Sequence, residues 1–349
     1  MHNIMNSQGR AQYLGRQSAW HKLGKTLGRF FTFEEACSYL DMNWDVYKAQ
    51  LRSPSGLPIP AYGVFRSDTD GFIATVGPNY QPINHIQGFR LADLLVGNKA
   101  GAYYETAGLL GTGQVVWGLV NLNEAFSIRG VDTHETYLLF TTSHDGSCAF
   151  TFKPTVIRVV CKNTHHVALS QAGQRLRIPH TTQGVASLDT ITTMLEESTT
   201  SFASYSEALN FLTTRAAQSS LIQDILVDLY PEPKLDTSKS FNHGHEAALT
   251  RHRRQIEAVL SAFESADSGA FPEFKGTYYQ LLQAITETED HRTEGAARSA
   301  VFGAGAARKA RALELIQVAA NGAPLANSPR TYSFSDQASS LLDEIAVGR

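Results

Sequence analysis

The stretch GSCAFTFKPTVIRVVCKNTHHVALSQAGQRLRIPH, residues 146–180, is the part of this chain that indicates most about its architecture. Its first half alternates apolar and polar residues and is rich in β-branched and aromatic side chains, which predicts a strand. Pro154 interrupts the alternation and predicts a bulge or an edge position. No Asp or Glu occurs from Gly146 to Leu188, so the cations of this stretch have no acidic neighbours in the sequence.

These cations suit the binding of a polyanion. Lys and Arg side chains that point outward from a strand contact phosphates, and small polar side chains at a helix start add hydrogen bonds. The sequence therefore predicts a single-stranded nucleic-acid site, with Trp20 stacking on a base beside Lys22. The predicted backbone contacts are Lys153, Arg158, Lys162, Asn163, Thr164, Arg175 and Arg177. The alternatives are a half-buried strand with solvated charges and a Trp20 that anchors the N-terminal arm to the core.

The pattern of the whole chain predicts an α+β fold. Short apolar runs separated by turn residues recur from Ala61 to about Val160, which is typical of an antiparallel sheet. Helical periodicity interrupts them after His85, and a capped helix is expected after Thr32. Beyond about Asn163, helix-compatible stretches take over. We predict a β-rich core domain with an N-terminal arm over residues 1–185, a helical region over residues 186–325 and a polar tail over residues 326–349.

Composition limits the class of protein. With 349 residues, of which 42% are hydrophobic, the chain can bury a sizeable core. The formal net charge of -3 confines any nucleic-acid site to a local basic groove. No apolar stretch reaches the roughly 20 residues of a membrane helix, and the start lacks the apolar region of a signal peptide. We therefore expect a cytoplasmic protein that does not contact membranes.

Several patterns were candidates for chemistry. Cys161 lies near His165 and His166, but the sequence marks neither an orienting group nor oxyanion donors for a cysteine enzyme. Glu287 and His291 are one helical turn apart and could bind a metal together with a second segment. The glycines of AGLLGTGQVVWG join two strands instead of preceding a helix, and the chain has no GxxxxGKS or GxxxxGKT. We predict no catalytic residue, no metal and no cofactor.

Two later segments are basic at helical spacing. Each could hold a phosphate backbone, and each could equally be a solvated face that balances Glu257 or Glu314. The two clusters are Arg251, Arg253 and Arg254 in the first segment and Arg308, Lys309 and Arg311 in the second.

Five collinear motifs extend over nearly the whole chain. They are SAWHKLG at 18–24, VGPNYQPINH at 76–85, ETAGLLGTGQVVWGLV at 105–120, TFKPTVIRVVCKNT at 151–164 and FGAGAARKARALEL at 302–315. Together they resemble the uncharacterised phage/plasmid-like protein family, a family with a domain of unknown function that also occurs in cryptic prophages. The resemblance implies a bacterial mobile-element or prophage protein acting in the cytoplasm, and it implies no catalytic residues.

An antiparallel sheet followed by helices, with a local basic groove, resembles the core layout of Rad52-like annealing proteins. We therefore predict a protein of mobile-element DNA metabolism and recombination that binds single-stranded DNA as a homo-oligomer, with the helical half providing subunit contacts. Two alternatives stay open. One is a small-molecule or nucleotide-processing enzyme with a pocket between residues 163–166 and 287–291, and the other is a non-enzymatic protein that interacts with a host factor. A closed cleft where histidines and carboxylates meet would favour the enzyme.

Overall fold

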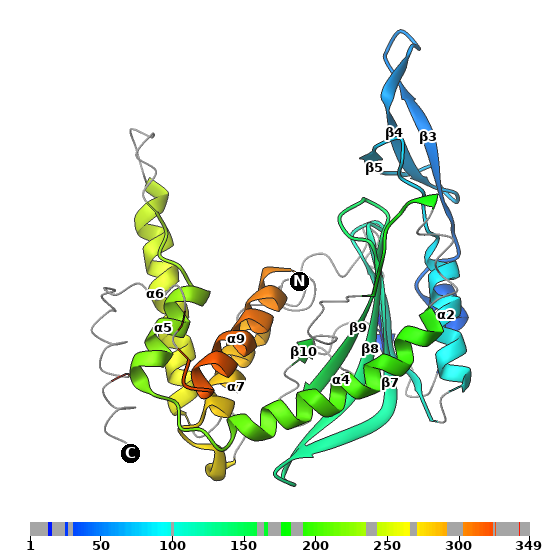
Figure 1. Ribbon diagram of the computed structural model, residues 1–349. Helices are drawn as coiled ribbons and strands as arrows, with labels where there is room; N and C mark the ends of the chain where they lie inside the picture. The colour runs from blue at the N-terminus through cyan, green and yellow to red at the C-terminus, as the bar shows by residue number, and fades with distance from the viewer. Residues whose placement is uncertain are drawn as a thin grey trace. The chain divides into compact units, whose positions relative to one another are not determined.

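The protein has an α+β fold, as predicted (Figure 1). Antiparallel sheets dominate the first half of the chain, and helices follow from residue 191. The computed structural model describes residues 13–15, 25–26, 31–98, 101–158, 164–166, 176–182, 191–234, 243–265, 271–291, 303–323, 325 and 342.

The larger sheet has eight strands, in the order β10-β9-β8-β7-β6-β1-β2, with β11 also paired to β9. Its long strands are β7 (Val115–Ile128), β8 (Asp132–Ser143) and β9 (Phe150–Arg158). The others are β1 (Tyr13–Gly15), β2 (Lys25–Thr26), β6 (Tyr103–Leu110), β10 (Thr164–His166) and β11 (Leu176–Ile178). From Thr136 to Ser143 every residue of β8 is buried, so both faces of this strand are covered. The apolar residues Tyr137 to Phe140 and the hydroxyl side chains of Thr136, Thr141, Thr142 and Ser143 are all part of the interior.

Strands β6 and β7 form a hairpin where the glycine-rich motif predicted a turn between two strands. Leu110 pairs with Val115, and the turn between them contains Gly111 and Gly113 with φ of +67° and +114°. Glycine adopts such positive φ values without steric cost. A Cβ on Gly113 would lie 2.6 Å from the ring of Trp44, so this glycine also allows Trp44 to pack against the turn.

A second sheet has three antiparallel strands, in the order β3 (Val46–Arg52), β4 (Pro58–Arg66) and β5 (Phe72–Val76). One of its faces is buried around Trp44, Val46, Val64 and Ile73. The sheet lies at the upper right of Figure 1. Its opposite face is not covered by this cluster.

Two short helices pack beside the sheets. Helix α1 (Phe33–Tyr39) begins with a capping box, in which the Glu35 amide donates to the Thr32 hydroxyl and the Thr32 amide donates to the Glu35 carboxylate. Helix α2 is His85–Asn98. The rings of Phe33 and Phe89 stack with centroids 3.7 Å apart and join the two helices. Both helices were expected from the sequence.

The second half of the chain is helical. Its elements are α4 (Ile191–Leu212), α5 (Ser219–Leu229), α6 (His243–Glu264), the 3-10 helix η2 (Pro272–Phe274), α7 (Tyr278–His291) and α9 (Ala304–Ala320). Helix α7 packs against α6 and α9 and is buried over most of its length. In the described parts of the chain, no helix is both long enough and apolar enough to cross a bilayer.

The chain divides into two compact units. Unit 1 contains residues 1–125, 135–156 and 166–203, and unit 2 contains residues 126–134, 157–165 and 204–349. Strands β7, β8 and β9 therefore contribute residues to both units. The predicted domain boundary at residue 185 lies outside the described residues, so that division stays a prediction.

Candidate nucleic-acid interface

Two of the predicted cations lie on one face of the sheet in unit 1. Arg177 of β11 is opposite Thr151 of β9, and Lys153 follows two positions along β9. Because alternate residues of a strand point to the same face, Lys153 and Arg177 share a face. Arg177 is exposed and Lys153 is half-buried. Lys153 and Arg177 are therefore diagonal neighbours on one face of the sheet.

Both cations also act on one thiol. Burial raises the pKa of Cys148, and the nearby Asp145 adds to the rise, whereas Lys153 and Arg177 lower it. That Lys153 and Arg177 both lower the pKa of Cys148 agrees with their position on one face of the sheet. Since the net effect keeps the thiol protonated at neutral pH, Cys148 is not prepared to act as a nucleophile.

The expectation that Arg158 points outward is wrong. Its side chain is 2% exposed, and its Nε and Nη2 atoms each lie 2.6 Å from Oδ2 of Asp132. Arg158 follows Lys153 by an odd number of residues, which turns the two side chains to opposite faces of a regular strand. A buried guanidinium requires a partner, and Asp132 at the start of β8 supplies it. Arg158 is thus part of the interior of unit 2.

Arg158 belongs to a buried polar cluster. Tyr279 of α7 donates to the same Asp132 oxygen at 2.6 Å, and His134 Nδ1 lies 3.2 Å from the Asp132 carbonyl. Burial lowers the pKa of His134 to about 4 and raises the pKa of Tyr279 well above its ordinary value. Both side chains are therefore neutral at pH 7, and the cluster serves to hold β8, β9 and α7 together.

The remaining predicted contacts are not described as side chains. Trp20, Lys22, Lys162, Asn163 and Arg175 lie outside the described residues. These five roles stay predictions.

The sequence predicted that Thr164 lies at the start of a helix. This prediction is wrong, because Thr164 begins strand β10, which pairs with β9. Its backbone lies at the edge of the larger sheet. Its predicted phosphate contact stays a prediction.

A buried histidine network in unit 1 was missed by the sequence reasoning. His85 Nε2 lies 2.8 Å from the carbonyl of Met42, and His85 Nδ1 lies 3.2 Å from His144 Nε2. Because the carbonyl can only accept, His85 Nε2 donates, so Nδ1 of the neutral ring accepts from His144 Nε2. Burial lowers the pKa of His85 and lowers that of His144 still further. No local motif marks this pair, because its residues are far apart in the sequence.

His180 lies next to this pair and is also neutral. Its Nδ1 accepts from the Ile83 amide at 3.3 Å, and its ring stacks on Tyr80 with centroids 5.0 Å apart. Burial lowers the pKa of His180 to about 4. Among the residues that the structure describes, no group of three or more His, Cys, Asp or Glu side chains is arranged to hold a metal ion. The histidines of unit 1 therefore form a packed polar core.

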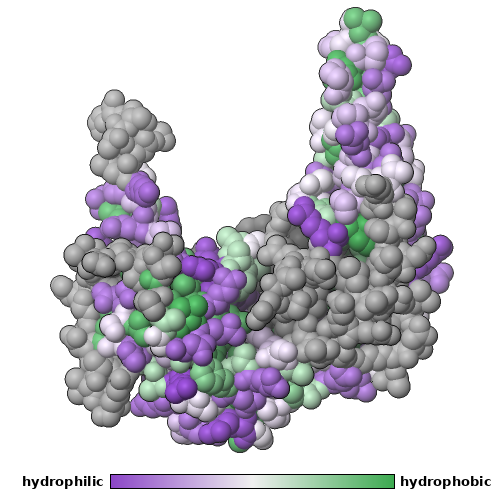
Figure 2. Space-filling view, viewed as in Figure 1, coloured by the Kyte–Doolittle hydropathy of each residue, from purple (hydrophilic) through white to green (hydrophobic). Residues whose placement is uncertain are grey.

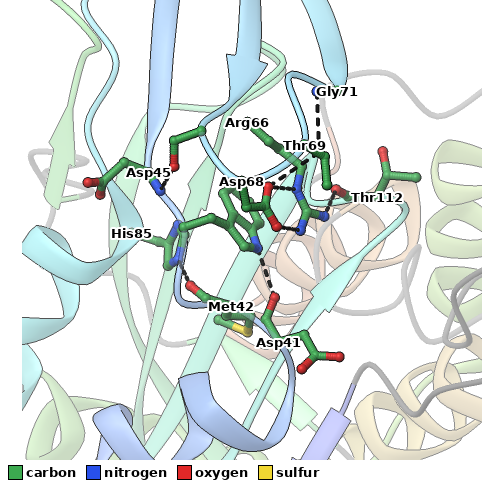
Figure 3. A network of polar contacts seen from close by, with 11 residues as sticks. Asp41, Met42, Asp45, Arg66, Asp68, Thr69, Gly71, His85 and Thr112 are labelled. Atoms are coloured by element: carbon green, nitrogen blue, oxygen red, sulfur yellow. Dashed lines mark hydrogen bonds and ion pairs between the residues drawn. The ribbon is translucent and has the colours of Figure 1, made fainter.

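Arg66 of β4 is engaged at the edge of this network (Figure 3). Its guanidinium lies 4.3 Å from the centroid of the Trp44 ring. It donates to the Asp68 carboxylate through Nε at 3.0 Å and Nη2 at 2.7 Å, and to the Thr112 carbonyl at 3.0 Å. With these partners, Arg66 stabilises the approach of the smaller sheet to the β6–β7 turn.

The basic cluster on α9 is paired within unit 2. Arg308 donates to both oxygens of Glu289 at 2.9 Å. Lys309 forms an ion pair with Asp290 of α7. Arg311 also reaches carboxylates, those of Asp228 and Glu314. All three cations bind acidic side chains of the protein itself. Only Arg311 is exposed, so only this residue fits the alternative of a solvated helix face.

The basic cluster on α6 differs. Arg251, Arg253 and Arg254 are all exposed. Within the described part of the chain, no ion pair involves any of the three. On α6 all three arginines are exposed, whereas on α9 only Arg311 is exposed and it pairs with Asp228 and Glu314.

Comparison with known families matches residues 73–315 to a family described as a domain of unknown function, DUF932. The chain belongs to the DUF932 family. The motifs from VGPNYQPINH to FGAGAARKARALEL all lie within this match. No curated protein and no solved structure matches the chain. For this DUF932 protein the family assigns no activity, and the predicted mobile-element context stays a prediction.

Proposed function

We propose that this DUF932 protein binds single-stranded nucleic acid through the face shared by Lys153 and Arg177. The observation that carries the proposal is the common placement of two cations in a stretch that lacks acids from Gly146 to Leu188. Such cations neutralise phosphates without reading bases, so the binding would depend on salt and little on base sequence.

The proposed setting is the DNA metabolism of a phage or mobile element, with strand annealing as the role. The motifs that resemble the phage/plasmid-like family support the setting. The antiparallel strands β6 to β9 are followed in the chain by helix α4, which resembles the element order of Rad52-like annealing proteins. A likeness of this kind supports only the class of function. A homo-oligomer that holds one strand by its phosphates would leave the bases accessible to a complementary strand, which would allow annealing.

The test is fluorescence anisotropy of labelled single-stranded and double-stranded oligonucleotides across a salt series. We expect the single strand to bind more tightly, with an affinity that falls as salt rises. The double variant Lys153→Gln with Arg177→Gln should weaken binding about a hundredfold, since it removes two charged hydrogen bonds of about 1.5 kcal/mol each. Its salt slope should fall by about 1.4, from about 0.7 per phosphate contact on a single strand.

Two control variants separate the site from general charge. Arg177→Lys keeps the cation and should keep the salt slope. Arg90→Gln removes an exposed cation from α2 and should leave the affinity unchanged. Unchanged affinity in a folded double variant would overturn the site. If the unaltered protein does not bind either oligonucleotide at low salt, the function itself is wrong, and the enzyme and host-interaction alternatives come first.

A further inference from the structure

Helix α6 of unit 2 has a buried side and an exposed side. The buried side chains are His252, Ile256, Val259, Leu260 and Phe263. The exposed residues lie three or four positions from their neighbours, so they form one stripe along the helix. We call the following exposed set the arginine stripe: Ala247, Thr250, Arg251, Arg254, Ala258 and Ser261.

Buried contacts fix the rotation of α6 about its own axis. His252 Nε2 donates to the carbonyl of Tyr230 at 2.8 Å, because a carbonyl can only accept. Gln255 donates to the buried Glu289 carboxylate at 3.0 Å. His252 has an arginine on each side in the sequence, and its buried hydrogen bond therefore turns these arginines outward.

Two arginines lie in the middle of the stripe. Arg251 and Arg254 are separated by roughly 60° around the helix axis and about 4.5 Å along it. Both are exposed, and neither forms an ion pair with a residue that the structure describes. The other side chains of the stripe are small, so an extended anion can approach the helix closely and contact both guanidinium groups.

The third arginine of α6 has different neighbours. Arg253 is exposed but is turned roughly 100° away from Arg254. Glu257 follows Arg253 by four positions and Glu246 precedes it by seven, which places this arginine in a row with two acids. Glu257 is also three positions beyond Arg254, at the border of the stripe. The acids of α6 therefore flank the stripe on the side of Arg253.

The arginine stripe has no apolar anchor. Among the described side chains of α6, no large hydrophobic residue is exposed, and Figure 2 shows mostly hydrophilic residues, in purple, on the part of this helix at the left. A helix that binds a membrane inserts apolar side chains, and protein interfaces are centred on aromatic anchors. Phosphate backbones are bound instead by arginines and by small hydroxyl side chains such as that of Ser261. The stripe therefore fits a nucleic-acid backbone better than a membrane or a protein.

We propose that the arginine stripe is a second surface for the phosphate backbone of a nucleic-acid strand. It belongs to unit 2, whereas Lys153 and Arg177 belong to unit 1. The inference rests on the proposed function for the class of ligand, and it adds a separate site. A chain with two such surfaces holds two strands, which annealing requires. The acids at its border make the stripe the weaker surface, so it fills after the first one.

The test counts the strands bound by each chain. A short oligothymidylate is titrated into the protein in a calorimeter at low salt, and we expect a tight step and a weaker step, with two strands per chain. Arg251→Gln with Arg254→Gln should weaken the second step about a hundredfold, because two charged hydrogen bonds are lost. One strand per chain then remains. An abasic deoxyribose-phosphate oligomer should fill the stripe equally well, since phosphates and not bases are contacted.

Three control variants separate the arginine stripe from general charge. Arg253→Gln removes the same charge from the acidic flank and should leave both steps unchanged. Arg251→Lys with Arg254→Lys keeps the cations and should keep the salt dependence of the second step. Lys153→Gln with Arg177→Gln should weaken the tight step and leave the binding at the stripe intact. Circular dichroism of each variant should match that of the unaltered protein.

The results distinguish this inference from the proposed function. If Arg251→Gln with Arg254→Gln binds as many strands as the unaltered protein, with equal affinity, the stripe is not a binding surface and the proposed function stands. An equal loss in Arg253→Gln would also overturn the stripe. If Lys153→Gln with Arg177→Gln changes neither step while the stripe variant loses binding, the site in unit 1 is wrong and the stripe stands. If the unaltered protein binds neither oligomer, both proposals fail.

Discussion

The two ends of strand β9 carry cations with opposite surroundings. Near its first end, β11 adds the exposed Arg177 to the face of Lys153. Its last residue, Arg158, is 2% exposed and donates to the Asp132 carboxylate. Tyr279 donates to the same carboxylate. An exposed cation can bind an anion from solution, whereas a buried one requires a fixed partner. The comparison teaches that the elements covering a strand, and not charge, decide which of its cations is exposed and which is buried.

The largest effect should come from breaking the buried end. Arg158→Leu is expected to lower the free energy of unfolding by about 3–5 kcal/mol, because it leaves a buried carboxylate without its cation. Asp132 Oδ1 has no hydrogen-bond partner in the described structure, so only Tyr279 would still donate to this carboxylate. Arg177→Leu at the exposed end should change the free energy by about 0.5 kcal/mol or less. Urea unfolding followed by circular dichroism measures both.

A double variant tests whether the unpaired charge causes the loss of stability in Arg158→Leu. Arg158→Met with Asp132→Leu removes both charges and should recover most of the lost stability, since apolar pairs replace buried ion pairs at little cost. A double variant as unstable as Arg158→Leu would show that shape, and not the unpaired charge, is responsible.

The same contrast should hold between the two basic helices. Arg308→Gln is expected to cost about 2 kcal/mol, because the buried Glu289 loses two charged hydrogen bonds. Arg253→Gln on α6 should change stability by about 0.5 kcal/mol or less, because that arginine is exposed and has no ion pair among the described residues. Calorimetric unfolding of the two variants compares them. Equal losses of unfolding free energy in the two variants would contradict the conclusion that Arg308 is a structural residue and Arg253 is not.

Acidification should weaken both units. Burial lowers the pKa of His134 in unit 2 and of His180 in unit 1 to about 4, from an ordinary value of 6.5. Between these values the unfolded chain binds protons that the folded chain does not, so stability is complete above about pH 6.5 and is lost toward pH 4. Urea midpoints measured from pH 4 to pH 8 should show this slope, and His134→Gln or His180→Gln should each reduce it. If both variants lose stability with falling pH as steeply as the unaltered protein, these two histidines are not the cause of the pH dependence.

The smallest effect among the buried contacts concerns the hydrogen bond between Tyr279 and Asp132. Tyr279→Phe should cost about 1 kcal/mol, the contribution of a single hydrogen bond, because Arg158 continues to neutralise the carboxylate. Thermal unfolding detects this loss. A loss as large as that of Arg158→Leu would mean that the tyrosine, and not the ion pair, organises the buried end.

Much of the fold could be predicted from the sequence. The strands that became β4 to β9, the capped helix after Thr32 and the glycine turn between β6 and β7 were all predicted from local patterns. These features are recognisable because side-chain alternation, capping and turn chemistry each involve residues within a few positions of one another.

The candidate site was less predictable. Lys153 and Arg177 were selected by charge, and only strand pairing showed that they share a face. The histidine network was missed because its residues are far apart in the sequence. Counting positions along β9 places Arg158 and Lys153 on opposite faces, but the elements that cover the strand decide which side chain is buried.

By itself, the sequence determined the order of strands and helices, the α+β class and the absence of acids around the β9 cations. The acids are absent only from the sequence stretch 146–188, since Asp132 binds Arg158 in the fold. Order, class and composition of this kind depend on local periodicity and residue counts. Only the tertiary structure decided that Arg158 is buried on Asp132 and that the α9 cations are paired while those of α6 are exposed. Each of these depends on which residues are neighbours in space, and burial in a low-dielectric interior then determines whether a charge must be neutralised or can bind a ligand.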